Sequence, residues 1–204
     1  MGVEVDLRVV ELLCGRLCHE LISPVGAINN GVELLSEDDP EFVKEAMGLI
    51  GQSARKAGQR LQFYRFAYGT SGASGVADPR ELSLGLFEGS KLRCDWAADA
   101  NGVANVWQRL ACNMLVLAAE FLPRGGTVRV RPLGTGVEVA AEGDTVNVSA
   151  ELAAALEAGT SVETLTARSV HAFYTMRLAQ QMGARLALAV AGPGRAVLTA
   201  SPAG

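Results

Sequence analysis

Apolar residues recur every three or four positions over the first 35 residues, which is the period of an amphipathic helix. On a helical wheel they fall within roughly 60° of the direction of Cys14 and form one apolar stripe. The stripe comprises Leu7, Val10, Leu17, Cys18, Leu21, Val25, Ile28, Val32 and Leu35. The pattern predicts a first helix from Val5 to Leu35 whose stripe faces a partner helix.

A second helix is predicted from Glu41 to Tyr68, after the polar turn at 36–40. Its stripe has the same spacing and comprises Phe42, Ala46, Leu49, Ser53, Ala57, Leu61 and Tyr64. Two antiparallel helices of this length cannot bury their stripes alone. Pairing two such hairpins into a four-helix bundle would bury them, so the sequence predicts a homodimer.

A glycine- and serine-rich stretch at 69–75 then predicts a flexible linker. We expect a helical hairpin over 1–69, the linker over 70–76 and a second domain over 77–204. In that domain helices are predicted at 80–89, 103–122, 151–158 and 168–182, and strands at 92–97, 127–131, 137–141, 186–190 and 195–199, with 146–148 extending the third strand. Helices beside a mostly antiparallel sheet indicate an α/β sandwich, and the whole chain is assigned to the α+β class.

His19 is one of two histidines in the chain. It lies about 140° from the centre of the apolar stripe on the wheel. Its own face carries Gly15, Ser23, Gly26 and Asn30, whose side chains are small or modest. A neutral imidazole nitrogen is a good nucleophile near pH 7, because its ordinary pKa is about 6.5. His19 is therefore a candidate nucleophile within reach of another protein's active site, the alternative being an ordinary solvated residue.

The neighbours of His19 bear on that chemistry. Glu20 is placed to orient the imidazole ring or to shuttle its proton. Pro24 has no N–H, so the carbonyl of Glu20 loses its intrahelical partner and the helix should kink there. A zincin-like metal site is excluded, because Ser23 stands where the second histidine of that motif belongs.

The composition of the chain limits which kinds of protein it can be and which partners it can have. Hydrophobic residues make up 49% of the chain, which supports a packed core. No apolar run is long enough to span a membrane, and the amino terminus lacks the features of a signal peptide, so a cytoplasmic protein is expected. The net charge of −4 argues against nucleic acid as the main partner. Cys14 and Cys18, one helical turn apart on the apolar stripe, are expected to pack as small hydrophobic residues.

The stretch His-Glu-Leu-Ile-Ser-Pro at 19–24 resembles the phosphoacceptor box of sensor histidine kinases, a family whose phosphoacceptor domain is a dimeric helical hairpin. The second domain is similar to the ATP-binding domain of that family. Residues 113–130 resemble its asparagine box and the strand behind it, and residues 177–186 resemble its late helix and the strand that follows.

The positions that depart from the kinase pattern all lie in the motifs that bind the nucleotide in kinases. Leu117 stands where the second asparagine of the asparagine box belongs. Ala-Ala-Glu-Gly-Asp at 140–144 replaces the Asp-x-Gly-x-Gly box that reads adenine, and the phosphate-lid region at 166–173 contains no glycine. Without those glycines the backbone cannot wrap a triphosphate closely. The chain is therefore expected to bind no ATP and to have no cofactor of its own.

A kinase-like layout with an intact phosphoacceptor box and an emptied nucleotide site resembles the ChpT-type histidine phosphotransferases of alphaproteobacterial phosphorelays. The segments 16–19, 53–56, 62–63 and 68–69 look like that family. The resemblance implies that a phosphoryl group passes from a receiver-domain aspartate of a hybrid kinase to His19, and from there to the aspartate of a response regulator. In that family the regulator is a cell-cycle transcription factor or a proteolysis adaptor.

The same resemblance implies which catalytic groups come from the receiver and which come from this chain. The receiver supplies the aspartate, Mg²⁺ and a lysine, while this chain supplies the nucleophile and a docking surface. His19 is the predicted phosphoacceptor, with Glu20 and Ser23 beside it in the catalytic box. Predicted docking residues are Arg16, Ile22, Gly26, Arg55, Lys56 and Arg65, of which Arg55 and Lys56 have solvated helix surface as the alternative. His171, the other histidine, is expected to be structural or on the surface.

Two other functions fit the same sequence. An ATP-dependent sensor-kinase core without its sensor would label His19 from ATP alone. A non-catalytic dimeric scaffold would bind receivers without accepting phosphate.

Overall fold

The computed structural model describes residues 6–36, 39–69 and 78–203. The predicted linker at 70–76 and the predicted helix start at Val5 lie outside these residues. The helices are α1 (Leu7–Leu34), α2 (Pro40–Tyr68), α3 (Pro79–Phe87), α4 (Asn105–Glu120), α5 (Ala150–Ala155) and α6 (Val170–Gln181), with 3₁₀ turns η1 (Ala98–Gly102) and η2 (Val162–Thr164). The strands are β1 (Leu92–Trp96), β2 (Gly126–Leu133), β3 (Gly136–Glu142), β4 (Ala184–Val190) and β5 (Arg195–Pro202).

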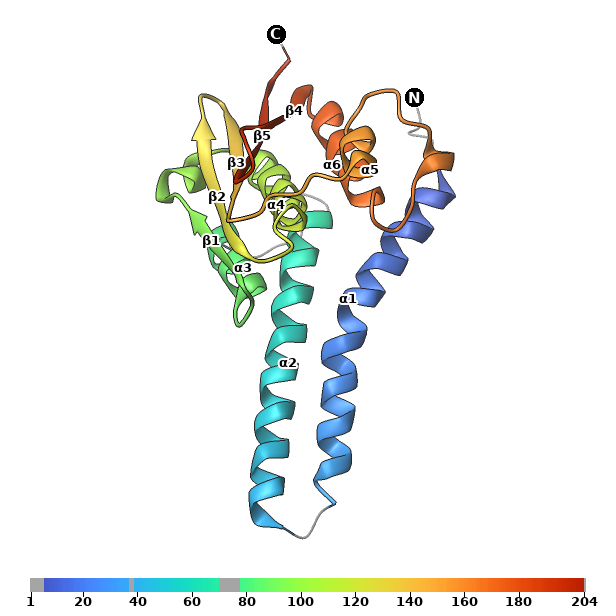
Figure 1. Ribbon diagram of the computed structural model, residues 1–204, viewed down its shortest axis with the longest axis vertical. Coiled ribbons are helices and arrows are strands. Elements are labelled where there is room, and N and C mark those ends of the chain that lie inside the picture. Colours follow the sequence, from blue (N-terminus) through green and yellow to red (C-terminus); the bar gives the residue numbers. More distant parts are fainter. Residues whose placement is uncertain (1–5, 37–38, 70–77, 204) are drawn as a thin grey trace.

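Helices α1 and α2 form a long antiparallel stem that projects from a mixed α/β domain (Figure 1). Each helix begins after an aspartate whose side chain accepts a hydrogen bond from a backbone N–H of the first turn. Asp6 accepts from Arg8 at 2.9 Å, and Asp39 accepts from Glu41 at 2.9 Å. The predicted helical hairpin is confirmed, with helix ends within one or two residues of the expected ones.

The two stem helices pack through small residues. The buried positions of the stem include Pro24 and Gly31 on α1 and Ala46 and Ser53 on α2. A Cβ added at Gly31 would lie 2.6 Å from a side-chain carbon of Ile50, so the close approach requires glycine. Several large apolar residues of the stem remain exposed: Ile22, Val25, Val32, Phe42, Met47, Leu49 and Leu61. The stripe predicted on α2 therefore divides: Ala46 and Ser53 are buried, Phe42, Leu49 and Leu61 are exposed, and Tyr64 packs against the core of the C-terminal domain.

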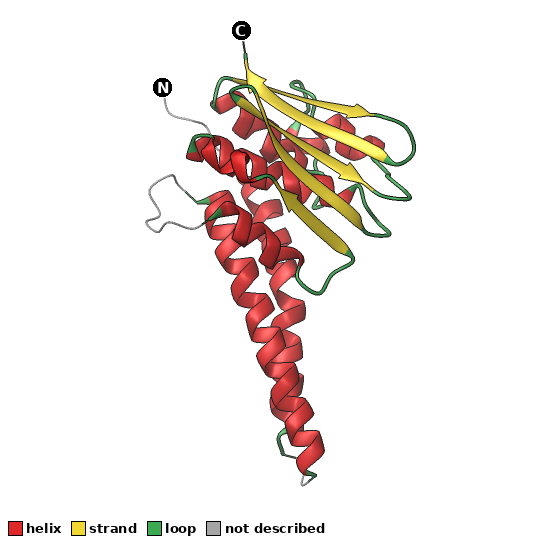
Figure 2. Cartoon of the chain, turned by 90° about the vertical axis from the view of Figure 1, so that its left-hand side faces the viewer, coloured by secondary structure: helices red, strands yellow, loops and turns green. Residues whose placement is uncertain are grey.

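The five-stranded sheet has the order β1-β2-β3-β5-β4. Strand β1 pairs parallel to β2, and the other pairs are antiparallel. Helices cover one face of the sheet and leave the other open (Figure 2). Alternate residues of the strands, such as Val130, Val139 and Leu198, are fully buried in the same core as Leu110 and Met114 of α4. The predicted α/β sandwich with a mostly antiparallel sheet is confirmed.

Two details of the predicted domain were wrong. Residues 146–148 do not extend the third strand, because the chain bends after Glu142 and its amides bind other loops. Val146 donates to the carbonyl of Pro193 at 3.0 Å, and Asn147 donates to the carbonyl of Phe121 at 2.8 Å. Helix α5 is also shorter than predicted and ends at Ala155. Within the described residues, no helix combines the length and the apolar character needed to cross a membrane.

Candidate functional site

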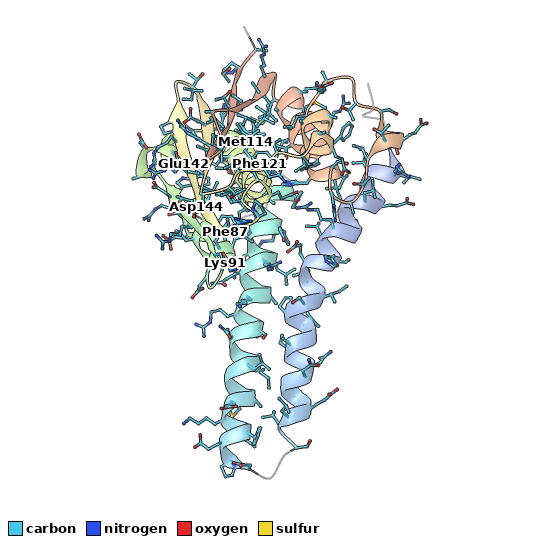
Figure 3. All side chains as sticks on the ribbon, viewed as in Figure 1. Phe87, Lys91, Met114, Phe121, Glu142 and Asp144 are labelled. Atoms are coloured by element: carbon cyan, nitrogen blue, oxygen red, sulfur yellow. The ribbon has the colours of Figure 1, made fainter. Side chains whose placement is uncertain are left out.

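His19 lies in the middle of α1 with its side chain exposed, as the helical pattern predicts. The surface beside it is open: Ser23 and Asn30 are exposed, and no atom lies within 4 Å of where a Cβ would stand at Gly15 or Gly26. Figure 3 shows side chains projecting outward from both sides of the stem. The imidazole is flanked by small residues on this face, and Ile22, one turn further along the helix, is a large exposed neighbour.

Glu20 is held by Arg60, which reaches across from α2. The Nη1 atom of Arg60 donates to the carboxylate of Glu20 and, at 3.0 Å, to its backbone carbonyl. That carbonyl lacks an intrahelical donor, because the residue four positions on is Pro24. Figure 1 shows α1 changing direction near its middle, as expected for a proline inside a helix. The residue that follows His19 is thereby fixed at both its backbone and its side chain.

A cleft of about 250 Å³ separates the stem from the C-terminal domain beside Glu20. Its polar rim includes Arg16, Glu20, Arg60, Tyr64 and Glu120, and its apolar wall includes Leu86, Phe87, Leu92, Val116 and Ala119. Phe87 is labelled in Figure 3, where it lies beside the upper part of α2. Burial, together with the charge of Glu20, raises the pKa of Tyr64 to about 12, so this hydroxyl is neutral at physiological pH.

The predicted docking residues do not share one environment. Ile22 is 66% exposed, and Arg55 and Arg65 are exposed on α2. Lys56 is also exposed, but its Cε atom lies 3.8 Å from the Cβ position of Gly89, so its side chain points toward the turn between α3 and β1.

Arg16 differs most from its expected place. Its guanidinium forms an ion pair with Glu120 at 2.5 Å, with only 17% of the side chain exposed. The same group donates to the carbonyl of Ala167 at 3.5 Å. The structure thus directs Arg16 toward the C-terminal domain and not toward solvent.

The asparagine of the kinase-like box is buried and fully engaged. The Nδ2 atom of Asn113 donates to the carbonyls of Ala67 and Arg109, each at 2.9 Å. Its Oδ1 atom lies 3.3 Å from Nε2 of His171. His171 is completely buried, which agrees with the expected structural role, and burial lowers the pKa of its imidazole. A nucleotide would find no free amide on Asn113.

Cys14 and Cys18 are both exposed in the single chain, so the packing predicted for them is not provided by the described residues of this protomer. Those residues also contain no cluster of three or more histidine, cysteine, aspartate or glutamate side chains suited to a metal ion.

The sequence pattern did not indicate the roles of Arg60, Glu120 and Arg8. Arg60 and Glu120 are partners of predicted site residues, and Arg8 donates to the carbonyls of Val162 at 3.2 Å and Leu165 at 2.9 Å. The partners of Arg8 and Glu120 lie more than a hundred positions away in the sequence, and the partner of Arg60 lies forty positions away. The only available signal was the unpaired carbonyl before Pro24, which requires a donor from elsewhere.

Comparisons with known proteins agree on one family. The model of the histidine phosphotransferase C-terminal domain matches residues 76–194. The chain is 34% identical over 199 residues to the protein phosphotransferase ChpT of Brucella abortus (strain 2308), with 92% of this chain and 94% of that protein covered. A 1.7 Å structure of a bacterial phosphotransferase superposes with a TM-score of 0.77 at 31% identity, with 98% of each chain covered.

Proposed function

This chain belongs to the histidine phosphotransferase family, and on that basis we propose that His19 relays a phosphoryl group between the aspartates of two receiver domains. The donor is the receiver of a hybrid kinase and the acceptor is a response regulator. The observation that carries the proposal is the exposed imidazole of His19 within the His-Glu-Leu-Ile-Ser-Pro box, on an open face of a rigid helix.

The transfer needs little chemistry from this chain. An unprotonated imidazole nitrogen of His19 attacks phosphorus in line, a P–N bond forms, and the P–O bond to the receiver's aspartate breaks to release a carboxylate. Transfer to the regulator runs the same step in reverse. Mg²⁺ comes from the partner receiver, and the chain has no cofactor of its own. Because Arg60 holds Glu20, we assign Glu20 a positioning role, with Ser23 beside the ring on the next turn.

The proposal excludes ATP as the phosphoryl donor. The amide oxygen of Asn113, the atom that Mg²⁺ would bind, is already engaged by Nε2 of His171 at 3.3 Å, and Leu117, at the position of the second asparagine, is buried in the core. These residues do not fit a nucleotide with Mg²⁺.

A homodimer is the second part of the proposal. The large apolar residues along the stem are exposed in one chain, and a second stem packed in a four-helix bundle would cover them. The phosphorelay role implies a cytoplasmic location, since receiver domains work there, and the resemblance to ChpT-type proteins implies a cell-cycle regulator as acceptor.

The direct test mixes the chain with a receiver domain carrying labelled phosphate and follows the label. We expect it to appear on the wild-type chain and then on a second receiver, and His19→Ala should remain folded, still bind the receiver and take up no label. His171→Gln is the comparison variant, because it removes the only other histidine and leaves His19 in place, and the small donor phosphoramidate should still label it.

Two results would contradict the relay. Labelling of His19 by ATP alone would make the chain a kinase. Receiver binding without transfer by the wild-type chain would make it a scaffold.

A further inference from the structure

The C-terminal domain is attached to both stem helices through polar contacts at the place where a kinase would hold its nucleotide. On the α2 side, Asn113 donates to the carbonyl of Ala67 at 2.9 Å. Ala67 lies in the last turn of α2, where carbonyl groups lack intrahelical donors. The buried amide of Asn113 therefore caps the end of the stem helix.

On the α1 side, two arginines about two turns apart reach the segment 162–167, just before α6. Arg8 donates to the carbonyls of Val162 and Leu165, and Arg16 donates to the carbonyl of Ala167. Arg16 also forms its ion pair with Glu120, the last residue of α4. The segment that leads into the lid-like region at 166–173 is thus bound to the helix that carries His19.

His171 lies between the two sides and contacts Asn113. Both amide hydrogens of Asn113 are used by carbonyls, so its Oδ1 accepts, and Nε2 of His171 carries the proton. The other ring nitrogen, Nδ1, lies 3.8 Å from Oε1 of Glu120. Nδ1 of His171 has no hydrogen-bond partner among the described residues, so His171 packs between two separate polar contacts. The Arg16–Glu120 ion pair joins α1 to α4, and Asn113 joins α4 to the end of α2. We call Arg16, Glu120, His171 and Asn113 together the latch.

We propose that the latch fixes the orientation of the C-terminal domain relative to His19, which makes Glu120 and Asn113 positioning residues for the docking of a receiver. The proposal rests on the relay function. Arg16 lies three residues before His19 on the same helix. The cleft between the stem and the C-terminal domain has Arg16 and Glu120 on its rim together with Glu20, the residue that follows His19. The position of the C-terminal domain, which the latch fixes, therefore determines how a receiver can approach His19.

The first test is Glu120→Gln in the full chain, with a receiver domain that the wild-type chain dephosphorylates. We expect the KM for the phosphorylated receiver to rise about tenfold while kcat changes less than about twofold, the signature of lost docking. Labelling of His19 by phosphoramidate, a small donor that needs no docking, should not change. Glu138→Gln is the matched control, because it removes an exposed contact to Arg195 on the open face of the sheet. A KM equal to that of the control would overturn the proposal.

The second test separates the latch from direct contact between Arg16 and the receiver. Arg16→Glu alone should raise the KM, and the double variant Arg16→Glu with Glu120→Arg should restore most of it, because the ion pair is rebuilt in reverse. Failure of the double variant to improve on Arg16→Glu would assign Arg16 to receiver contact and overturn the latch.

A third measurement is independent of transfer. Small-angle X-ray scattering should show a broader distribution of domain positions for Asn113→Ala and Glu120→Gln than for wild type. Unchanged scattering from both variants would overturn the latch even if the relay holds. A wild-type chain that takes phosphate neither from a receiver nor from phosphoramidate would refute the relay. The scattering measurement would still test whether the latch fixes the position of the C-terminal domain.

Discussion

The guanidinium of Arg60 supplies Glu20 with the hydrogen bond that α1 itself cannot make. Its Nη1 atom lies 3.0 Å from the carbonyl oxygen of Glu20, which has lost its helical donor to Pro24, and it also bonds the carboxylate. A residue of α2 therefore completes α1 immediately after His19. The proline bends the helix, and the arginine stabilises the bend.

Replacing Arg60 with methionine should destabilise the protein and slow transfer. The carbonyl and the carboxylate of Glu20 would lose their partner, and both side chains of the ion pair are about a third exposed. The expected loss is about 1 kcal/mol in the free energy of unfolding, because water replaces part of the contact. Urea unfolding measures it, and Gln52→Met, at an exposed site on the same helix, should show no comparable loss.

A double-mutant cycle with Pro24→Ala tests the physical reason. Alanine at this position has an N–H that can donate to the carbonyl of Glu20. In that background Arg60→Met should cost less, with a coupling free energy of about 0.5–1 kcal/mol. Strict additivity of the two substitutions would mean that Arg60 does not replace the missing helical bond.

Gly26→Leu should separate stability from docking. Gly26 lies two helical turns after His19 on the same face, with open space at its Cβ position. Removing a glycine from a helix interior stabilises by about 0.5–1 kcal/mol, but the new side chain would stand where a receiver approaches. We expect normal or raised stability, at least about tenfold slower transfer, which is about 1.4 kcal/mol, and unchanged labelling by phosphoramidate.

Gly51→Leu is the matched control for this substitution. Gly51 is exposed, whereas Gly26 is half-buried, and Gly51 likewise has nothing within 4 Å of its Cβ position, but it lies on α2 and not on the helix of His19. It should share the gain in stability and transfer normally. Normal transfer by Gly26→Leu would remove this face of α1 from the docking surface.

Acid should destabilise the protein through His171. Burial lowers the pKa of its imidazole, although Glu120 beside it acts in the opposite direction. As pH falls below about 6.5, the ordinary histidine value, the unfolded chain binds a proton that the folded chain does not. The free energy of unfolding should therefore decrease from pH 6.5 downward and be insensitive to this group above that pH. Urea unfolding at pH 7.5, 6.5 and 5.5 measures the change.

His171→Gln is the variant that tests the assignment. Its side-chain amide can still donate to Oδ1 of Asn113 but does not titrate, so the decrease between pH 6.5 and 5.5 should become smaller. The carboxyl group of Glu120 causes a second decrease in the free energy of unfolding at lower pH. Burial raises the pKa of its carboxyl, but His171 and Arg16 lower it by more, and the stability this provides disappears as pH falls below the ordinary glutamate range. An unchanged slope in His171→Gln would contradict the burial of a neutral imidazole.

The elements of the fold could be predicted because they depend on local patterns. The period of apolar residues predicts α1 and α2, and the alternation at 127–131 and 137–141 predicts β2 and β3, which the structure joins through a turn at Gly134, where φ is +57°. The stretch 146–148 has the same alternation but forms no strand, since its amides bind Pro193 and Phe121. Local alternation cannot reveal such a competing partner.

In the candidate site, too, the features that depend on local sequence could be predicted and the long-range contacts could not. The exposure of His19 follows from its angle on the helix, and the free carbonyl of Glu20 follows from Pro24. The partners of Arg16 could not be predicted, because an arginine next to the phosphoacceptor box has the same sequence signature whether it faces a receiver or Glu120. Only the contact between α1 and α4 decides between the two.

The homodimer can be tested at Val32, which belongs to the apolar stripe of α1 and is 54% exposed in one chain. In a four-helix bundle this side chain would lie in the seam between protomers, and an aspartate there would be desolvated without a partner. Val32→Asp should raise the dimer dissociation constant by at least about a hundredfold, equivalent to about 2.7 kcal/mol, as measured by sedimentation equilibrium. Asn30→Asp adds the same charge on the opposite face of α1 and should leave the dimer intact. A dimer that tolerates Val32→Asp as well as Asn30→Asp would place the seam elsewhere on the stem.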